Sequence, residues 1–262
     1  MFAPEQLTED GFLGGRLRVL QPREGYRAAT DPVLMAAAVP ALPGQTVLEL
    51  GCGAGVASLC LGRRVAVGLT GLEIQTPYAA LARENAARNG IDMQVVEGDV
   101  AAMPIRGAFD HVMANPPYYA GGTASADAGR DLALREGLPL ADWLAAMARR
   151  LRPGGWATLI LGADRLPDAM RGMPGTLGSV TVLPLAAREG RAAKRIVVQA
   201  RKGGRAAFTL AAPFILHAGA AHNQDGDDFT DPARSILRQG CGFPQPLGRC
   251  ISISPPSGQR DR

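Results

Sequence analysis

Short apolar runs alternate with amphipathic segments along most of the chain. Seven of these runs are largely apolar, as strands buried on both faces of a parallel sheet should be. They occupy residues 46–50, 66–73, 93–99, 109–115, 156–161, 179–185 and 195–201. Helical patterns separate most of them, so the sequence predicts an α/β fold with a doubly wound, mostly parallel sheet of seven strands.

Capping residues mark where several predicted helices begin and end. Thr30 or Asp31 caps a helix that runs to residue 39, and Thr76 caps a helix that Gly90 ends. The other predicted helices cover residues 56–64, 139–155 and 231–240, and Asp231 is the predicted cap of the last one. Residues 10–29 have the pattern of an irregular hairpin, and residues 207–217 that of an added strand.

Composition and charge narrow the class of protein. Seven of the 28 Lys and Arg residues lie between residues 188 and 205, where there is one acidic residue, so the positive charge is concentrated as a polyanion-binding surface requires. The four cysteines form no CxxC pair, which argues against a zinc site, and we expect no metal. The longest apolar run, at residues 33–42, is too short to cross a bilayer. We therefore expect a cytoplasmic protein with free thiols and no membrane contact.

A glycine loop follows the first predicted strand of the sheet. Gly51, Gly53 and Gly55 allow the backbone to approach a ligand closely. Ligands of open α/β sheets bind at the carboxyl ends of the strands. Three acidic residues stand at or near those ends, namely Glu49, Glu73 and Asp99. A carboxylate suits the hydroxyl groups of a ribose or an adenine amino group, and the loop lacks a phosphate-binding lysine. The predicted ligand is S-adenosylmethionine.

The tetrapeptide Asn115-Pro116-Pro117-Tyr118 follows another strand of the sheet. The segments "LELGCGAG", "GLE", "GD" and "NPPY", in this order, resemble those of Rossmann-like class I S-adenosylmethionine-dependent methyltransferases that modify exocyclic or amide nitrogen. With "ATDPVLMAAA" and "GRDLALREGLPLADWL", the chain looks more like the bacterial family that methylates N6 of an adenosine in valine tRNA. The resemblance covers roughly residues 10–240.

Chemistry explains why such an enzyme needs this tetrapeptide. The lone pair of an adenine amino nitrogen is delocalised into the ring, which makes it a poor nucleophile. The Asn115 side-chain carbonyl and the Pro116 backbone carbonyl can each accept a hydrogen bond from the amine. The rigid Pro116 and Pro117 fix the direction of the backbone carbonyl. Tyr118 offers a face on which a flipped base can stack, and Tyr119 is a second candidate for this role.

The resemblance also suggests roles for residues outside the loop and the tetrapeptide. Asp31 lies in a segment that resembles a lid over the cofactor. In this fold the sixth strand ends at the cofactor edge and the seventh returns antiparallel. The turn between them should therefore lie near the active site. It carries four candidates for binding RNA phosphates, namely Arg188, Arg191, Lys194 and Arg195.

The predicted organisation is one domain with additions. Residues 1–44 form an N-terminal extension, a hairpin and a helix, that packs on the cofactor site. Residues 45–205 form the methyltransferase domain, residues 206–240 a C-terminal addition to it, and residues 241–262 a disordered tail.

The sequence predicts methylation of an adenosine N6 amine in RNA, with tRNA preferred. A protein glutamine-N5 methyltransferase is an alternative, because a side-chain amide presents a similar NH2 group. A non-catalytic cofactor-binding module in RNA assembly is another, and DNA remains open as a substrate. The sequence leaves the oligomeric state open, as a monomer or a homodimer.

Overall fold

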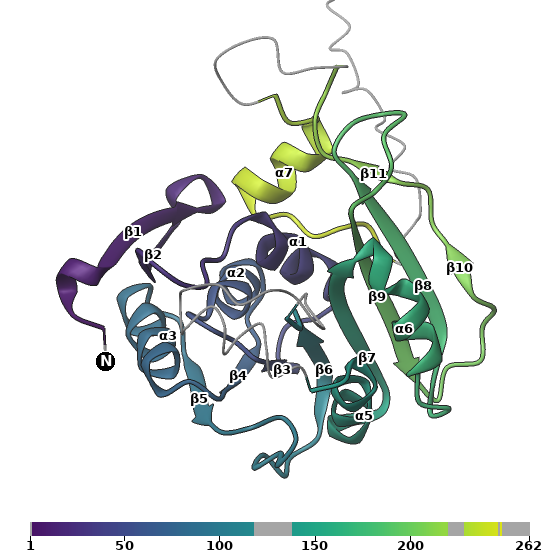
Figure 1. Ribbon diagram of the computed structural model, residues 1–262, viewed down its shortest axis with the longest axis horizontal. Coiled ribbons are helices and arrows are strands. Elements are labelled where there is room, and N and C mark those ends of the chain that lie inside the picture. Colours follow the sequence, from purple (N-terminus) through teal and green to yellow (C-terminus); the bar gives the residue numbers. More distant parts are fainter. Residues whose placement is uncertain (1, 118–137, 220–227, 246, 248–262) are drawn as a thin grey trace, which may run out of the picture.

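The computed structural model describes residues 2–117, 138–219, 228–245 and 247 (Figure 1). Within them, a nine-stranded sheet has the order β10-β8-β9-β7-β6-β3-β4-β5, and β11 also pairs with β8. Its strands are β3 (Thr46–Leu50), β4 (Gly68–Glu73), β5 (Met93–Glu97), β6 (Phe109–Ala114), β7 (Leu151–Gly162), β8 (Leu177–Ala186), β9 (Arg195–Lys202), β10 (Thr209–Leu210) and β11 (Phe214–Ile215).

The strand directions agree with the predicted fold. All neighbouring strands pair in parallel except β9, which is antiparallel to both β7 and β8. The seven predicted strands are all present. Two more arise because residues 207–217, predicted as one added strand, form the short strands β10 and β11 on the edge of β8. Pro213 lies between them and has no N–H group to continue the ladder.

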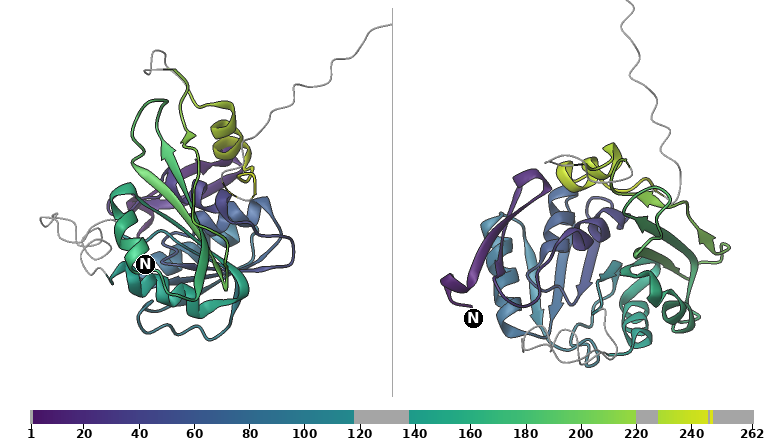
Figure 2. Two further views of the ribbon diagram at one scale, coloured as in Figure 1. Left: turned by 90° about the vertical axis from the view of Figure 1, so that its right-hand side faces the viewer. Right: turned by 45° about the horizontal axis from the view of Figure 1, so that its top comes forward.

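Helices cover both faces of the sheet (Figures 1 and 2). Buried residues of α1, α2 and α3 share one apolar cluster, and those of α5 and α6 share another on the opposite face. The helices are α1 (Thr30–Ala38), α2 (Val56–Arg64), α3 (Thr76–Arg88), α5 (Leu140–Arg150), α6 (Leu166–Arg171) and α7 (Asp231–Gln239). Short 3-10 turns occur at Pro4–Gln6, Leu13–Gly15 and Ala163–Arg165.

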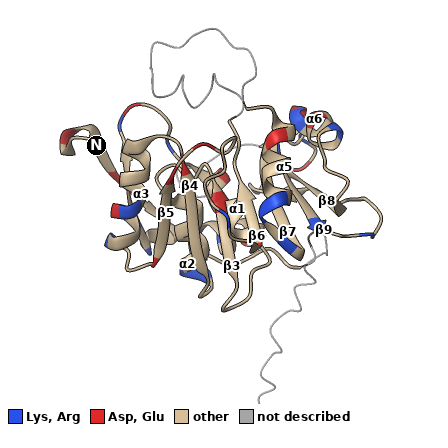
Figure 3. Ribbon diagram, turned by 90° about the horizontal axis from the view of Figure 1, so that it is seen from below, with Lys and Arg blue, Asp and Glu red and all other residues tan. Residues whose placement is uncertain are grey.

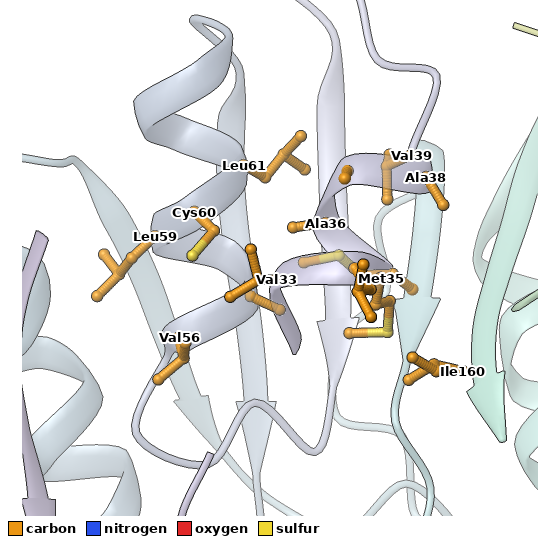
Figure 4. Close-up of a cluster of buried hydrophobic side chains, with 14 of the residues drawn as sticks. Val33, Met35, Ala36, Ala38, Val39, Val56, Leu59, Cys60, Leu61 and Ile160 are labelled. Atoms are coloured by element: carbon orange, nitrogen blue, oxygen red, sulfur yellow. The ribbon is translucent and has the colours of Figure 1, made fainter. Parts of the chain in front are cut away.

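Alternation along the strands builds the two cores. On β3, Val47 contributes to the cluster beneath α1 and α2, whereas Leu48 and Leu50 contribute to the cluster beneath α5. Figure 4 shows the first cluster, in which Met35 of α1 and Ile160 of β7 are completely buried. Because both faces are packed, the strand register is fixed, and with it the positions of the residues at the strand ends.

The N-terminal hairpin consists of β1 (Leu7–Phe12) and β2 (Leu17–Pro22), and it lies beside α3 (Figure 1). Two asparagines of the α3 segment complete the edge of β2. The Asn85 amide accepts from the backbone N–H of Leu20 at 2.8 Å and donates to its carbonyl at 3.0 Å. Asn89 pairs in the same way with Arg18. Asn85 also donates to the carbonyl of Ala54, so one buried amide connects the hairpin to the glycine loop.

The C-terminal part differs from the sequence prediction in two details. The hydroxyl of Thr230 caps α7 by accepting from the Ala233 N–H, and Asp231, predicted as the cap, is the first helical residue. The sequence also predicts a tail from residue 241, but Phe243 and Leu247 are buried in the main core. The Phe243 N–H donates to the carbonyl of Ala37 at 2.9 Å, which ties this segment to α1.

Candidate active site

A cavity of about 350 Å³ lies at the carboxyl ends of β3, β4 and β6. The glycine loop contributes Gly51 and Gly53 to its wall, and the tetrapeptide contributes Asn115, Pro116 and Pro117. The two sequence motifs therefore share one cavity, as predicted from the parallel order of the strands. Among the described residues, the lining includes the carboxyl groups of Glu73 and Asp99 and no Lys or Arg.

The glycine loop needs its glycines for both conformation and space. Gly51, Gly53 and Gly55 all have a positive φ, which side chains strongly disfavour. A Cβ atom on Gly51 would also lie 3.1 Å from the ring of Trp143. The N–H groups of Gly51 and Cys52 donate to the Leu72 carbonyl at 2.8 and 3.0 Å, which holds the loop against the end of β4.

Glu73 fixes the loop and lines the cavity. One carboxylate oxygen accepts from the Gly53 N–H at 2.8 Å, and the other accepts from the Gln75 N–H at 2.9 Å. Burial raises the pKa of Glu73, and the backbone hydrogen bonds oppose this shift. A carboxylate has about four acceptor sites, so Glu73 can still accept from hydroxyl groups of a ligand.

Asp99 and the residues around it complete the wall beyond β5. Asp99 lines the cavity, and its Oδ1 accepts from the Ala101 N–H at 2.9 Å. Ile74, directly after Glu73, also lines the cavity, and it is 59% exposed although it is apolar. An exposed apolar side chain beside two carboxylates suits a ligand with a flat ring and hydrogen-bond donors.

Glu49 and Gly55, predicted to contact the cofactor, are not part of the cavity lining. Glu49 is 3% exposed, and its Oε2 accepts from the N–H and the hydroxyl of Ser58 at 3.0 and 2.6 Å. Burial raises the pKa of Glu49 to about 8; the Ser58 hydrogen bonds lower it, and the charge of Glu73 raises it. In the observed geometry Glu49 joins β3 to α2 beneath the loop.

The buried Glu49 should make the protein less stable as the pH rises. The folded state keeps the proton up to about pH 8, whereas the unfolded chain loses it near the ordinary glutamate pKa of 4.5. The free energy of unfolding should therefore fall by up to about 1.4 kcal/mol per pH unit within this window. Burial lowers the pKa of His111 to about 4, so this residue adds stability as the pH rises through the ordinary histidine pKa of 6.5. The contribution is the same in a Glu49 variant, so the comparison between the two proteins cancels it.

Denaturant unfolding between pH 6.5 and 8.5 tests this expectation. The Glu49→Gln variant should show a flatter decline of the unfolding free energy than the unmodified protein. The exposed Glu97 provides the control, and its replacement by Gln should leave the decline unchanged. Parallel profiles for the unmodified protein and the Glu49 variant would show that Glu49 is charged in the folded state.

Asn115 and Pro116 stand directly after β6, at the edge where the glycine loop follows β3. The Asn115 Nδ2 donates to the Tyr26 hydroxyl at 3.3 Å. The Arg165 guanidinium approaches the Pro117 carbonyl at 3.5 Å. Tyr118 and Tyr119, predicted as stacking surfaces, lie outside the described residues.

Several aromatic residues of the cavity were not predicted from the sequence. Tyr26 reaches the cavity from the segment between β2 and α1, Tyr78 from α3 and Trp143 from α5. Trp143 is 8% exposed, and on sequence alone it is indistinguishable from a core residue of an amphipathic helix. No periodic pattern of apolar residues surrounds Tyr26, so the sequence does not indicate that this residue lines the cavity.

Asp31 and Arg195, predicted for different ligands, bind each other. The Arg195 Nε donates to Asp31 Oδ2 at 2.9 Å, which joins the start of α1 to the start of β9. Neither residue lines the cavity. The pair connects the N-terminal extension to the turn between β8 and β9, at the carboxyl edge of the sheet.

The other basic residues of that turn have different surroundings. The Arg188 guanidinium binds the carboxylate of Asp228 and the carbonyls of Ala218 and Gly219, and it thereby holds the C-terminal addition. Arg191 and Lys194 are exposed. No hydrogen bond or ion pair of their side chains occurs within the described part of the chain. They remain the better candidates for contacting phosphates.

Charges of both signs lie together on α6 (Figure 3). Asp168 pairs with Arg165 at 3.3 Å and with Arg171 at 2.7 Å. These arginines are therefore partly neutralised. Within the described residues, no helix is long and apolar enough to cross a membrane. No cluster of three or more His, Cys, Asp or Glu side chains that could hold a metal occurs in the same part of the chain.

Comparisons with known proteins agree with these features. The family model of the methyltransferase small domain matches residues 29–182, more than half of the 262-residue chain. The tRNA1(Val) (adenine(37)-N6)-methyltransferase of Shewanella sp. (strain MR-4) is 31% identical over 149 residues, which cover 54% of this chain. The protein of the same name from Aeromonas hydrophila is 28% identical over 198 residues, which cover 74% of this chain and 84% of that protein. The chain spans 63% of the Shewanella relative, slightly less than two thirds.

Solved structures agree with the fold. A predicted O-methyltransferase from Agrobacterium tumefaciens aligns with a TM-score of 0.64 and 24% identity over 81% of this chain and 98% of its own. The 16S rRNA N2 G1207 methyltransferase of T. thermophilus, solved with AdoMet and guanosine, aligns with a TM-score of 0.52 and 21% identity, over 75% of this chain and 50% of its own. At these identities, the similarities establish the fold.

Proposed function

Because this chain belongs to the family of methyltransferase small domains, we propose that it methylates the exocyclic N6 amine of an adenosine in RNA, with tRNA preferred. The predicted class I, S-adenosylmethionine-dependent methyltransferase is confirmed at the level of family and fold. The observation that carries the substrate proposal is the shared cavity, in which Asn115 and Pro116 face the same space as the glycine loop and Glu73.

The charge of the cavity fits S-adenosylmethionine. The ligand has a ribose, an adenine, a positive sulfonium and no phosphate. The cavity offers the carboxyl groups of Glu73 and Asp99, and no basic side chain occurs among its described lining residues. Glu73 would accept from the ribose hydroxyls and Asp99 from the adenine amine. When bound, S-adenosylmethionine supplies an electrophilic methyl group on its sulfonium sulfur.

Asn115 and Pro116 suit a planar nitrogen acceptor. The side-chain carbonyl of Asn115 and the backbone carbonyl of Pro116 can each accept a hydrogen bond from one N–H group of an amine. These hydrogen bonds draw the nitrogen toward tetrahedral geometry and localise its lone pair. They strengthen as positive charge develops on the nitrogen, so they stabilise the transition state more than the ground state. No strong base is needed, because the amine becomes acidic once it is methylated.

The names of similar proteins support RNA as the substrate. Relatives from Shewanella and Aeromonas are adenine-N6 methyltransferases of tRNA1(Val). Arg191 and Lys194, exposed basic residues of the turn between β8 and β9, lie at the carboxyl edge of the sheet. Their positive charge supports a polyanionic substrate, whose phosphate backbone would pass a flipped adenosine at this edge.

Methyl transfer from radiolabelled S-adenosylmethionine tests the proposal. The full chain is incubated separately with unmodified tRNA, duplex DNA and a peptide release factor, and the products are digested to nucleosides or peptides. We expect label in tRNA as N6-methyladenosine. Label confined to the release factor would replace the proposal with glutamine methylation, and label confined to DNA would replace the RNA substrate. Cofactor binding without transfer to any acceptor would indicate a non-catalytic module.

The basic turn gives a separate prediction about tRNA binding. A double replacement of Arg191 and Lys194 by Ala should weaken tRNA binding and reduce the salt dependence. The slope of log Kd against log salt concentration should decrease by roughly 1.5, because each phosphate contact contributes about 0.7 to 0.9. Fluorescence anisotropy with labelled tRNA from about 50 to 300 mM salt measures both quantities.

A charge-matched variant at the opposite edge of the sheet is the control. Arg149 lies in the last turn of α5 and Arg205 follows β9, and both are exposed. Their double replacement by Ala removes the same charge but should leave the salt slope nearly unchanged. Equal effects of the two double variants would mean that net charge, and not the turn, determines binding.

A further inference from the structure

Tyr26 lies between the two motifs of the active site. It lines the cavity, and a Cβ atom on Gly53 would lie 3.6 Å from its ring. Its backbone carbonyl accepts from the Tyr78 hydroxyl at 3.0 Å, which holds the segment between β2 and α1 against α3. Its hydroxyl reaches the Asn115 amide at 3.3 Å. A single side chain of the N-terminal extension thus contacts both the cofactor loop and the tetrapeptide.

The hydrogen bond between Tyr26 and Asn115 favours one of the two orientations of the Asn115 amide. An amide has an accepting end and a donating end, and rotation by 180° exchanges them. Methylation as proposed above requires the oxygen to face the acceptor amine, so the NH2 group must face the other side. That side is occupied by the Tyr26 hydroxyl oxygen, which accepts from Nδ2. The reversed amide would present its N–H bonds to the N–H bonds of the substrate.

The surroundings of Tyr26 keep its hydroxyl neutral and able to accept from Asn115. Burial raises the pKa of Tyr26, and the nearby carboxyl groups of Glu49 and Asp31 raise it further. The phenol therefore stays neutral at the pH of the cell. The neutral hydroxyl keeps a lone pair for the positive end of the Asn115 amide, which is its NH2 group.

We propose that Tyr26 is a positioning residue that holds the Asn115 amide with its oxygen toward the acceptor nitrogen. This inference rests on the proposed function and adds a part of the N-terminal extension to the catalytic geometry. Tyr26 takes no part in proton transfer. Without its hydroxyl, the Asn115 NH2 group loses this acceptor in the productive orientation, and fewer enzyme molecules are ready for transfer.

The Tyr26→Phe variant tests the proposal, because it keeps the ring over Gly53 and removes the hydroxyl. We expect kcat to fall about 10- to 100-fold, the range that the loss of one acceptor for a buried polar group allows. The KM and Kd for S-adenosylmethionine should stay within about twofold of the original values. The thermal midpoint should change little. A packing role of the hydroxyl would instead affect cofactor affinity and the thermal midpoint.

The Tyr26→Leu variant separates the two functions of the side chain. It removes the ring as well as the hydroxyl, so cofactor binding should weaken in addition to the loss of kcat. Unchanged kcat in Tyr26→Phe, with an active unmodified enzyme, would overturn the positioning role and leave the proposed function intact. Loss of kcat together with an equal loss of cofactor affinity would also overturn it. An unmodified enzyme that methylates no acceptor would contradict the proposed function instead.

Discussion

Replacement of Asn115 by Ala is expected to lower kcat for methyl transfer by about 100- to 1,000-fold or more, and to leave the Kd of S-adenosylmethionine within about twofold. The size of the effect is that of removing one preorganised hydrogen-bonding group aimed at charge that develops in the transition state. Cofactor affinity should persist because the glycine loop and Glu73 hold their own hydrogen bonds, which do not involve Asn115.

Two measurements are needed for this prediction. Single-turnover transfer to tRNA gives the rate of the chemical step, and calorimetric titration gives cofactor affinity. Replacement of Gln94 by Ala is a matched control, since this exposed amide lies on β5 outside the cavity lining. It should leave both quantities unchanged. A variant that loses cofactor affinity along with activity would show that the division of roles between loop and tetrapeptide is wrong.

Replacement of Glu73 by Ala should weaken cofactor binding and leave the rate of the chemical step nearly unchanged, the opposite of the effect at Asn115. Cofactor affinity should fall by roughly 100-fold or more, because a charge-assisted hydrogen bond contributes about 1.5–3 kcal/mol and this carboxylate can make two to a ribose. The Gly53 N–H also loses its acceptor, which loosens the loop. At saturating cofactor, single-turnover transfer should recover most of its rate, since Asn115 stays in place.

Glu97 provides the matched control for Glu73. It is the register partner of Glu73 on the neighbouring strand, but it pairs with Arg83 outside the cavity lining. Its replacement by Ala should leave cofactor affinity unchanged. If the Glu73 and Glu97 variants bind S-adenosylmethionine equally well, the ribose does not lie at the end of β4.

The fold and the centre of the site could be predicted because their signals are local. Strand, glycine loop and helix are contiguous in the chain, and the carboxyl ends of parallel strands must share an edge. Gly51, Glu73, Asp99 and Asn115 therefore line one cavity although they are far apart in sequence. Glu49 has the same local signal, but the alternation along β3 directs its side chain beneath the loop, toward Ser58.

The outer parts of the site depend on tertiary contacts that have no local pattern. Tyr26 reaches Asn115 because buried Asn85 docks the hairpin against α3. Arg188 could not be distinguished from Arg191 by sequence, since the choice depends on Asp228, which is 40 residues further along the chain. The burial of Phe243 likewise depends on its contact with Ala37 of α1.

The central claim is that methyl donor and acceptor amine meet in the cavity between the glycine loop and Asn115. A crystal structure with S-adenosylhomocysteine and a short adenosine-containing RNA tests it most directly. We expect the ribose at Glu73, the sulfur toward the tetrapeptide, and the adenine N6 within hydrogen-bond distance of the Asn115 Oδ1 and the Pro116 carbonyl. A cofactor bound away from Gly53, or an adenine whose N6 lies beyond the reach of both oxygens, would contradict the account.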